Sequence, residues 1–160
     1  MQRTFGSRSG RWLLLGCGLS AAMAMQAPDP APKLQAEADA AQGGKRAELL
    51  IHLAHLEVDR ATQAYVQQQV AQGAGQLGAA EQHAAAAYLT LQQQAAHGKK
   101  NGVRKVEIEV RKISLGLQDL ARDVQLEDQS PVAHAAKTFT DLRDHLLSLL
   151  FGDGENKGAK

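Results

Sequence analysis

The clearest pattern in the chain is a heptad spacing of apolar residues between positions 103 and 126. Apolar side chains recur there at alternating intervals of three and four residues: Val103, Val106, Val110, Ile113, Leu117, Leu120 and Val124. This spacing places all seven on one face of an α-helix. Residues 106–110 also alternate as a strand would, but the longer heptad pattern outweighs these five positions. We therefore predict a helix over 103–126.

Three further segments, at about 45–72, 77–97 and 131–151, show the same helical spacing. Ser130 is expected to cap the last of them, with Pro131 at its first position. The glycine-rich stretches 73–78 and 98–102 predict turns, because each glycine costs about 1 kcal/mol inside a helix. Helices of similar length joined by short turns predict an all-α fold, an antiparallel four-helix bundle. The alternative is a dimer of coiled-coil helical hairpins.

The first 27 residues resemble a secretory signal peptide. Arg3, Arg8 and Arg11 precede a short apolar run over 12–25, and an Ala-x-Ala cleavage pattern follows at 22–24. A mitochondrial presequence fits less well, because the run is uniformly apolar rather than amphipathic. Cys17 follows Leu-Leu-Gly, as in the lipobox of bacterial lipoproteins, so it is either acylated or removed with the signal. We expect export to the periplasm or the extracellular space, with a membrane anchor at Cys17 as the alternative.

The predicted domain organisation has three parts after the signal peptide. Residues 28–44 are rich in Pro, Ala and Gln and end in two glycines, which predicts a flexible tether with a short helical turn near 34–41. Residues 45–151 are expected to form the helical bundle. The polar residues 152–160 are expected to form a disordered tail.

Composition narrows the possible functions. Aromatic residues make up only 4% of the 160 residues, which favours packed helices over β architectures. Loss of the signal peptide would remove the single cysteine and three arginines, so Lys and Arg would fall from 18 to 15 against 17 Asp and Glu. A domain without cysteine contains no disulfide, and a charge near neutral gives no footprint for nucleic acid.

One polar row carries the candidate metal ligands. Glu48, His52, His55 and Asp59 are spaced by four, three and four residues, which places them on one helix face. Such a row provides ligands for Zn²⁺, Ni²⁺ or Cu²⁺, but it also coincides with the polar face of an amphipathic helix. The last helix carries a similar row that includes His134 and His145. The two rows would face each other if the first and last helices were neighbours.

A basic loop is the second candidate site. Lys99, Lys100, Arg104 and Lys105 bring four positive charges to one end of the predicted bundle. This loop is either a solvated turn or a contact surface for an acidic partner or an anionic membrane.

The sequence contains neither a phosphate-binding loop after a strand nor a nucleophile elbow. We therefore expect a non-enzymatic, exported helical scaffold or adaptor that binds a protein partner or itself, with no cofactor and no small-molecule substrate. The alternative function is a periplasmic metal-binding or metal-sensing protein that uses the His and carboxylate row.

Overall fold

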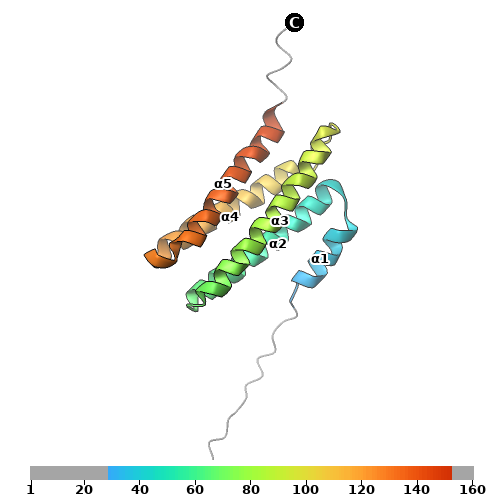
Figure 1. Ribbon diagram of the computed structural model, residues 1–160. Helices are drawn as coiled ribbons and strands as arrows, with labels where there is room; N and C mark the ends of the chain where they lie inside the picture. Colours follow the sequence, from blue (N-terminus) through green and yellow to red (C-terminus); the bar gives the residue numbers. More distant parts are fainter. Residues whose placement is uncertain (1–28, 153–160) are drawn as a thin grey trace, which may run out of the picture.

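The computed structural model describes residues 29–152, so the expected signal peptide, Cys17 and the tail from 153 onwards lie outside the described residues. The described part contains helices only (Figure 1). A short helix, α1 (Ala31–Ala40), precedes α2 (Gly43–Val66), α3 (Val70–Ala96) and α4 (Val103–Asp123). A 3₁₀ turn, η1 (Leu126–Asp128), then leads into α5 (Gln129–Phe151). No helix within 29–152 is long and apolar enough to span a membrane.

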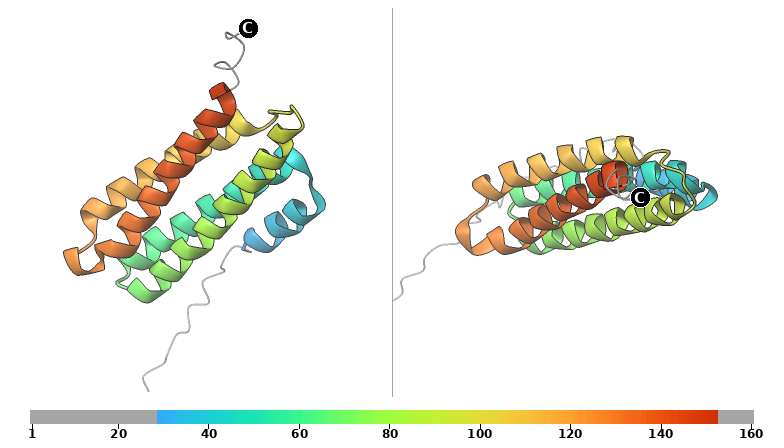
Figure 2. Two further views of the ribbon diagram at one scale, coloured as in Figure 1. Left: turned by 45° about the horizontal axis from the view of Figure 1, so that its top comes forward. Right: turned by 90° about the horizontal axis from the view of Figure 1, so that it is seen from above.

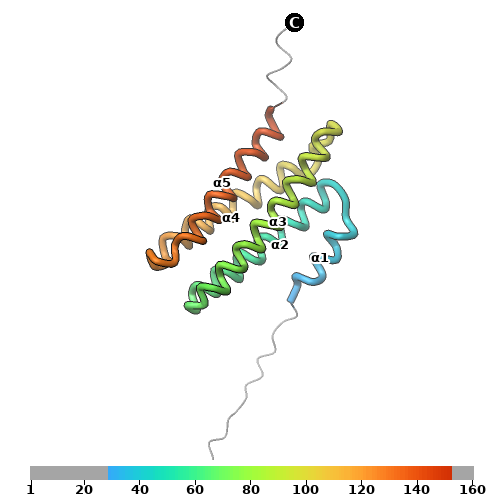
Figure 3. Tube along the Cα trace, viewed as in Figure 1, coloured from blue at the N-terminus to red at the C-terminus, as the bar shows by residue number. Residues whose placement is uncertain are grey.

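The four long helices form two hairpins that pack side by side. α2 packs mainly against α3, and α4 packs mainly against α5, while α2 also contacts α4 and α3 contacts α5. Figure 2 shows the two hairpins with roughly aligned axes and α1 on the outside, beside α2. The chain reverses within each hairpin, as the tube in Figure 3 shows, so helices that face each other across the two hairpins run parallel. The α2–α3 turn and the α4–α5 link therefore share one end of the bundle.

The heptad positions form the hydrophobic core, as their spacing predicts. All the predicted positions of α4 up to Leu120 are buried, and Val124, just beyond the helix, is partly buried. The other three long helices contribute the same kind of stripe, which includes Ile51 and Val58 of α2, Leu77 and Leu91 of α3, and Phe139 of α5. Helical amphipathicity thus positions each long helix toward one shared core.

The turn between α2 and α3 differs from the prediction. It lies at Gln67–Gln69, and glycines 73–78 belong to α3 instead. Gln68 adopts a left-handed backbone with φ of 60°, and the Gln69 amide donates to the Ala64 carbonyl at 2.8 Å, which closes the turn. Gly73 is buried against the ring of Tyr65, where a Cβ atom would lie 2.7 Å from Cε2. The glycine therefore allows close helix packing rather than a chain reversal.

The structure also differs from the prediction in the tether segment, where residues 31–40 form α1. Its first turn contains proline, and the Asp29 carboxylate accepts a hydrogen bond of 2.9 Å from the Ala31 amide. Ala38 is fully buried, and Ala31 and Leu34 pack on the core at the same helical spacing. This small apolar face gives α1 a surface to bury against α2. The Asp29 carboxylate also pairs with Arg60 of α2.

The start of the last helix is shifted slightly. α5 begins at Gln129, so Ser130 is inside the helix and does not cap it. Pro131 is tolerated in the first turn because its missing N–H would have no helical partner there. The Gln129 side-chain amide donates to the Val124 carbonyl at 3.2 Å, across the link from α4.

Candidate binding surfaces

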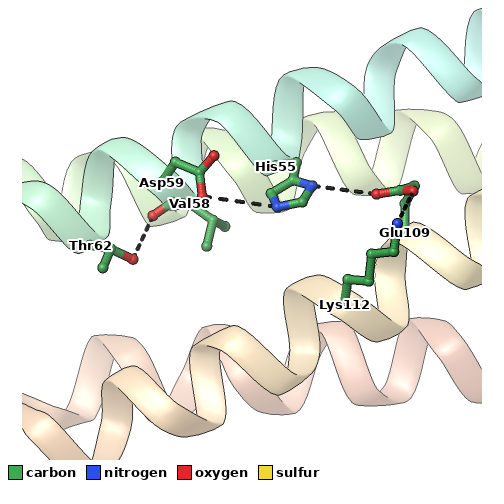
Figure 4. Close-up of polar contacts among 6 residues, drawn as sticks. All are labelled: His55, Val58, Asp59, Thr62, Glu109 and Lys112. Carbon is green, nitrogen blue, oxygen red and sulfur yellow. Dashed lines mark hydrogen bonds and ion pairs between the residues drawn. The ribbon is translucent and has the colours of Figure 1, made fainter.

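The predicted row on α2 faces α4, and one of its histidines bridges the two helices. His55 Nδ1 lies 3.4 Å from Glu109 Oε2 of α4, and His55 Nε2 lies 3.9 Å from Asp59 Oδ1 (Figure 4). Glu109 also accepts a hydrogen bond of 2.8 Å from Lys112. This bond, and the positive charges of Lys112 and of protonated histidine nearby, lower the pKa of Glu109, although its burial acts in the opposite direction.

The remaining members of the α2 row do not join His55 in one cluster. Glu48 Oε1 pairs with Lys105 Nζ at 3.2 Å, and His52 lines a small groove of about 190 Å³ together with Glu109. Within residues 29–152, no group of three or more His, Cys, Asp or Glu side chains is placed to hold a metal ion. The row is therefore a set of separate polar contacts along the seam between α2 and α4.

The condition under which the rows on the first and last helices would face each other is not met, because α2 and α5 are not neighbours. α2 packs against α1, α3 and α4, whereas α5 packs against α3 and α4. His134 Nε2 lies 3.7 Å from Glu81 Oε1 of α3, and the His145 ring lies 5.7 Å from the Tyr88 ring of the same helix. Because α2 and α5 occupy opposite corners of the bundle, their histidines cannot share a ligand.

The basic loop belongs to a larger cluster, which we call the basic end. Because α2 and α4 run parallel, their N-termini meet there, and a Cβ atom on Gly44 would lie only 2.4 Å from the Asn101 carbonyl oxygen. The cluster therefore gains Lys45 and Arg46 from α2. The basic end comprises six cations: Lys45, Arg46, Lys99, Lys100, Arg104 and Lys105.

Most of the charge at the basic end is not neutralised by the described part of the chain. Lys105 pairs with Glu48, and Lys100 donates to the Leu150 carbonyl at 3.3 Å. Among residues 29–152, the other four cations of the basic end form no ion pair, and all four are exposed. An open cleft of about 600 Å³ has two of them, Lys45 and Lys99, in its wall, together with the paired Glu48 and Lys105.

Helix stability does not explain these cations. Lys45 and Arg46 lie in the first turn of α2, and Arg104 and Lys105 lie in the first turn of α4; neither turn contains an acidic residue. The helix dipole makes an N-terminus positive, so each cation there costs about 0.3–1 kcal/mol instead of stabilising the helix. Residues that run against the charge preference of a helix terminus in this way are typical of functional surfaces.

The opposite end of the bundle is acidic and partly apolar. Residues 119–128 contain Asp119, Asp123, Glu127 and Asp128 against a single cation, Arg122, and we call these four the acidic end. A cleft of about 460 Å³ opens beside them, with apolar walls from both hairpins: Tyr65, Val66, Val70, Leu120 and Val124. Burial, and the nearby charge of Asp128, raise the pKa of Tyr65.

Comparison with models of known protein families, with curated proteins and with solved structures finds no match to this chain. The surfaces of the bundle itself are therefore the guide to function.

Three residues of these candidate binding surfaces were not predicted from the sequence. Glu109 is the carboxylate nearest His55, and the only feature of the sequence that pointed to it was a polar position beside the α4 seam. Lys45 and Arg46 are far from the basic loop in sequence, and only the parallel arrangement of α2 and α4 brings them together.

Proposed function

We propose that this protein is a non-enzymatic, exported scaffold or adaptor that binds an acidic protein surface through its basic end. The observation that carries the proposal is the group of four exposed cations that form no ion pair within residues 29–152, two of which, Lys45 and Lys99, line an open cleft. Unneutralised charges of one sign raise the local concentration of oppositely charged partners and speed their association. The signal-like residues 1–27 support export.

The test is the affinity of the full chain for a fluorescently labelled, glutamate-rich peptide, measured by anisotropy at low and high salt. We expect binding that weakens as salt increases, since the contact is electrostatic. The double variant Lys99→Glu/Arg104→Glu should lose most of the affinity. Its matched control is Lys33→Glu/Lys137→Glu, which changes net charge equally at two exposed lysines elsewhere.

Two results would contradict this function. An equal loss in both double variants would mean that net charge, not the basic end, determines binding. Absence of peptide binding together with tight binding to vesicles containing anionic phospholipid would instead indicate a membrane-contacting protein.

Metal binding by the α2 row is a second candidate function: no three ligand side chains of residues 29–152 gather around one point, but His55 lies within 4 Å of two carboxylates, Asp59 and Glu109. Calorimetric titration of Zn²⁺, Ni²⁺ and Cu²⁺ into the full chain and into the His52→Ala/His55→Ala variant tests it. Micromolar binding that this variant loses would support a metal site on α2. Binding weaker than about 0.1 mM, or unchanged in the variant, would reject the site, because specific sites for these metals bind far more tightly.

A further inference from the structure

We propose that the acidic surface recognised by the basic end is the acidic end of a second copy of this chain, so that copies associate head to tail. The inference rests on the proposed function and names the partner of the same surface. Figures 1 and 2 show the bundle as elongated. The inference follows from the charges and the exposed apolar side chains at its two ends.

The charges at the two ends are complementary. Asp123 and Glu127 are exposed and form no ion pair within residues 29–152, just as Lys99 and Arg104 form none at the basic end. Asp123 is the last residue of α4, where the negative end of the helix dipole disfavours a carboxylate. Both ends therefore carry charges that the described part of the chain leaves unpaired and that the opposite end of another copy would neutralise.

Exposed apolar side chains accompany the charges at both ends. Val66, the last residue of α2, and Leu126, the first residue of η1, lie at the acidic end and are 78% and 85% exposed, and Val66 forms part of the cleft wall. Phe151, in the last turn of α5 at the basic end, is 75% exposed, and the neighbouring Leu150 carbonyl is held by Lys100. The cleft at the acidic end is large enough for an aromatic side chain, so Phe151 of one copy is the residue we place in it. Burial of an aromatic anchor inside a charged rim is the usual construction of a protein interface.

The geometry of the two ends determines the kind of assembly. The surfaces are different from each other and lie at opposite ends of helices about 36 Å long at 1.5 Å per residue. A contact of this heterologous type leaves one basic end and one acidic end free on every dimer. Further copies can therefore add, which would give a linear scaffold.

Sedimentation velocity of the full chain over a range of concentrations tests the proposal. We expect a mass that rises with concentration and falls with added salt. Two variants reverse the charge of one end each: Lys45→Glu/Arg46→Glu/Lys99→Glu/Arg104→Glu at the basic end and Asp123→Lys/Glu127→Lys at the acidic end. Each should remain monomeric alone, because both of its ends then carry the same sign. An equimolar mixture should assemble again, since the acidic ends of one variant match the basic ends of the other.

The mixture also controls for folding, because a variant that failed to fold would not restore assembly. Phe151→Ala should weaken self-association by about tenfold, as expected for the loss of a buried aromatic anchor. The control variant Lys33→Glu/Lys137→Glu should assemble like the original chain.

The outcomes separate this inference from the proposed function. A chain that stays monomeric at all concentrations but binds the glutamate-rich peptide through its basic end would overturn the inference and leave the proposed function intact. Assembly that persists in both end-reversed variants would overturn the inference by placing the interface elsewhere. Monomeric variants that do not assemble on mixing would overturn the pairing of the two ends. Loss of both peptide binding and assembly would overturn both proposals.

Discussion

Alanine substitutions in the glycine-rich stretch 73–78 test whether it is helical. The structure predicts that two of them stabilise the protein and that the third destabilises it. Gly75 and Gly78 lie within α3, and a Cβ atom at either position would meet nothing within 4 Å. At Gly73, a Cβ atom would lie 2.7 and 2.8 Å from two carbons of the Tyr65 ring, a residue that is only 8% exposed. All three substitutions replace glycine with alanine, so any difference between their effects on stability comes from the surroundings of each site.

The expected magnitudes follow from helix propensity and overpacking. Alanine is favoured over glycine in a helix interior by about 0.5–1 kcal/mol, so Gly75→Ala and Gly78→Ala should each stabilise the protein by about that amount. Gly73→Ala gains the same propensity term but overpacks against Tyr65, which costs about 1–3 kcal/mol. We therefore expect Gly73→Ala to be destabilising by about 1 kcal/mol relative to the original chain.

Chemical denaturation followed by circular dichroism measures these changes, and a double-mutant cycle isolates the ring contact. In a Tyr65→Ala background, Gly73→Ala should become stabilising, because the ring that it would strike is gone. Thermal shifts of about 2–4 °C per kcal/mol give a second readout for a chain of this size. Destabilisation by Gly75→Ala would refute a helical conformation there and favour the turn that the sequence suggests. Equal effects at Gly73 and Gly75 would refute the contact with Tyr65.

Three further perturbations test the core, the helix junction and one ion pair. Gly44→Ala should destabilise the fold by about 2 kcal/mol or more in urea denaturation, because its Cβ atom would strike loop backbone that cannot rotate away. A change in stability of less than about 0.5 kcal/mol would contradict the close approach of α2 and α4. Phe139→Ala should cost about 3–5 kcal/mol, since Phe139 is fully buried, whereas the exposed Phe151→Ala should change the stability of the monomer by less than about 0.5 kcal/mol. The pKa of Glu109 is lowered in the folded protein, so its ionised carboxylate contributes stability at pH values above the ordinary carboxyl pKa. This contribution is lost as the pH falls through the lowered pKa of Glu109. Lys112→Met should therefore reduce the difference in unfolding free energy between about pH 7 and about pH 3, and an unchanged difference would argue against the bond.

Sequence spacing alone identified the four long helices and their buried faces, but it missed α1 and misplaced the turn between α2 and α3. The seam of α4 from Val103 to Leu120 is buried as its heptad spacing predicts, and Phe139 of α5 lies in the hydrophobic core. Periodicity succeeds here because the side of a helix that a residue occupies depends only on its position along that helix. The polar row on α2 and the basic loop were visible for the same reason.

The tertiary structure decided which of these faces meet. The spacing of His52 and His55 is the same whether α2 lies beside α5 or beside α4, and only packing of the hairpins selects α4, with Glu109 as the partner of His55. The close packing of Gly73 against the Tyr65 ring likewise results from how α3 packs on α2. The meeting of two basic helix N-termini results from parallel packing of α2 and α4. Local spacing does not specify these contacts, because the free energy that orders them comes from apolar surface buried between segments far apart in the chain.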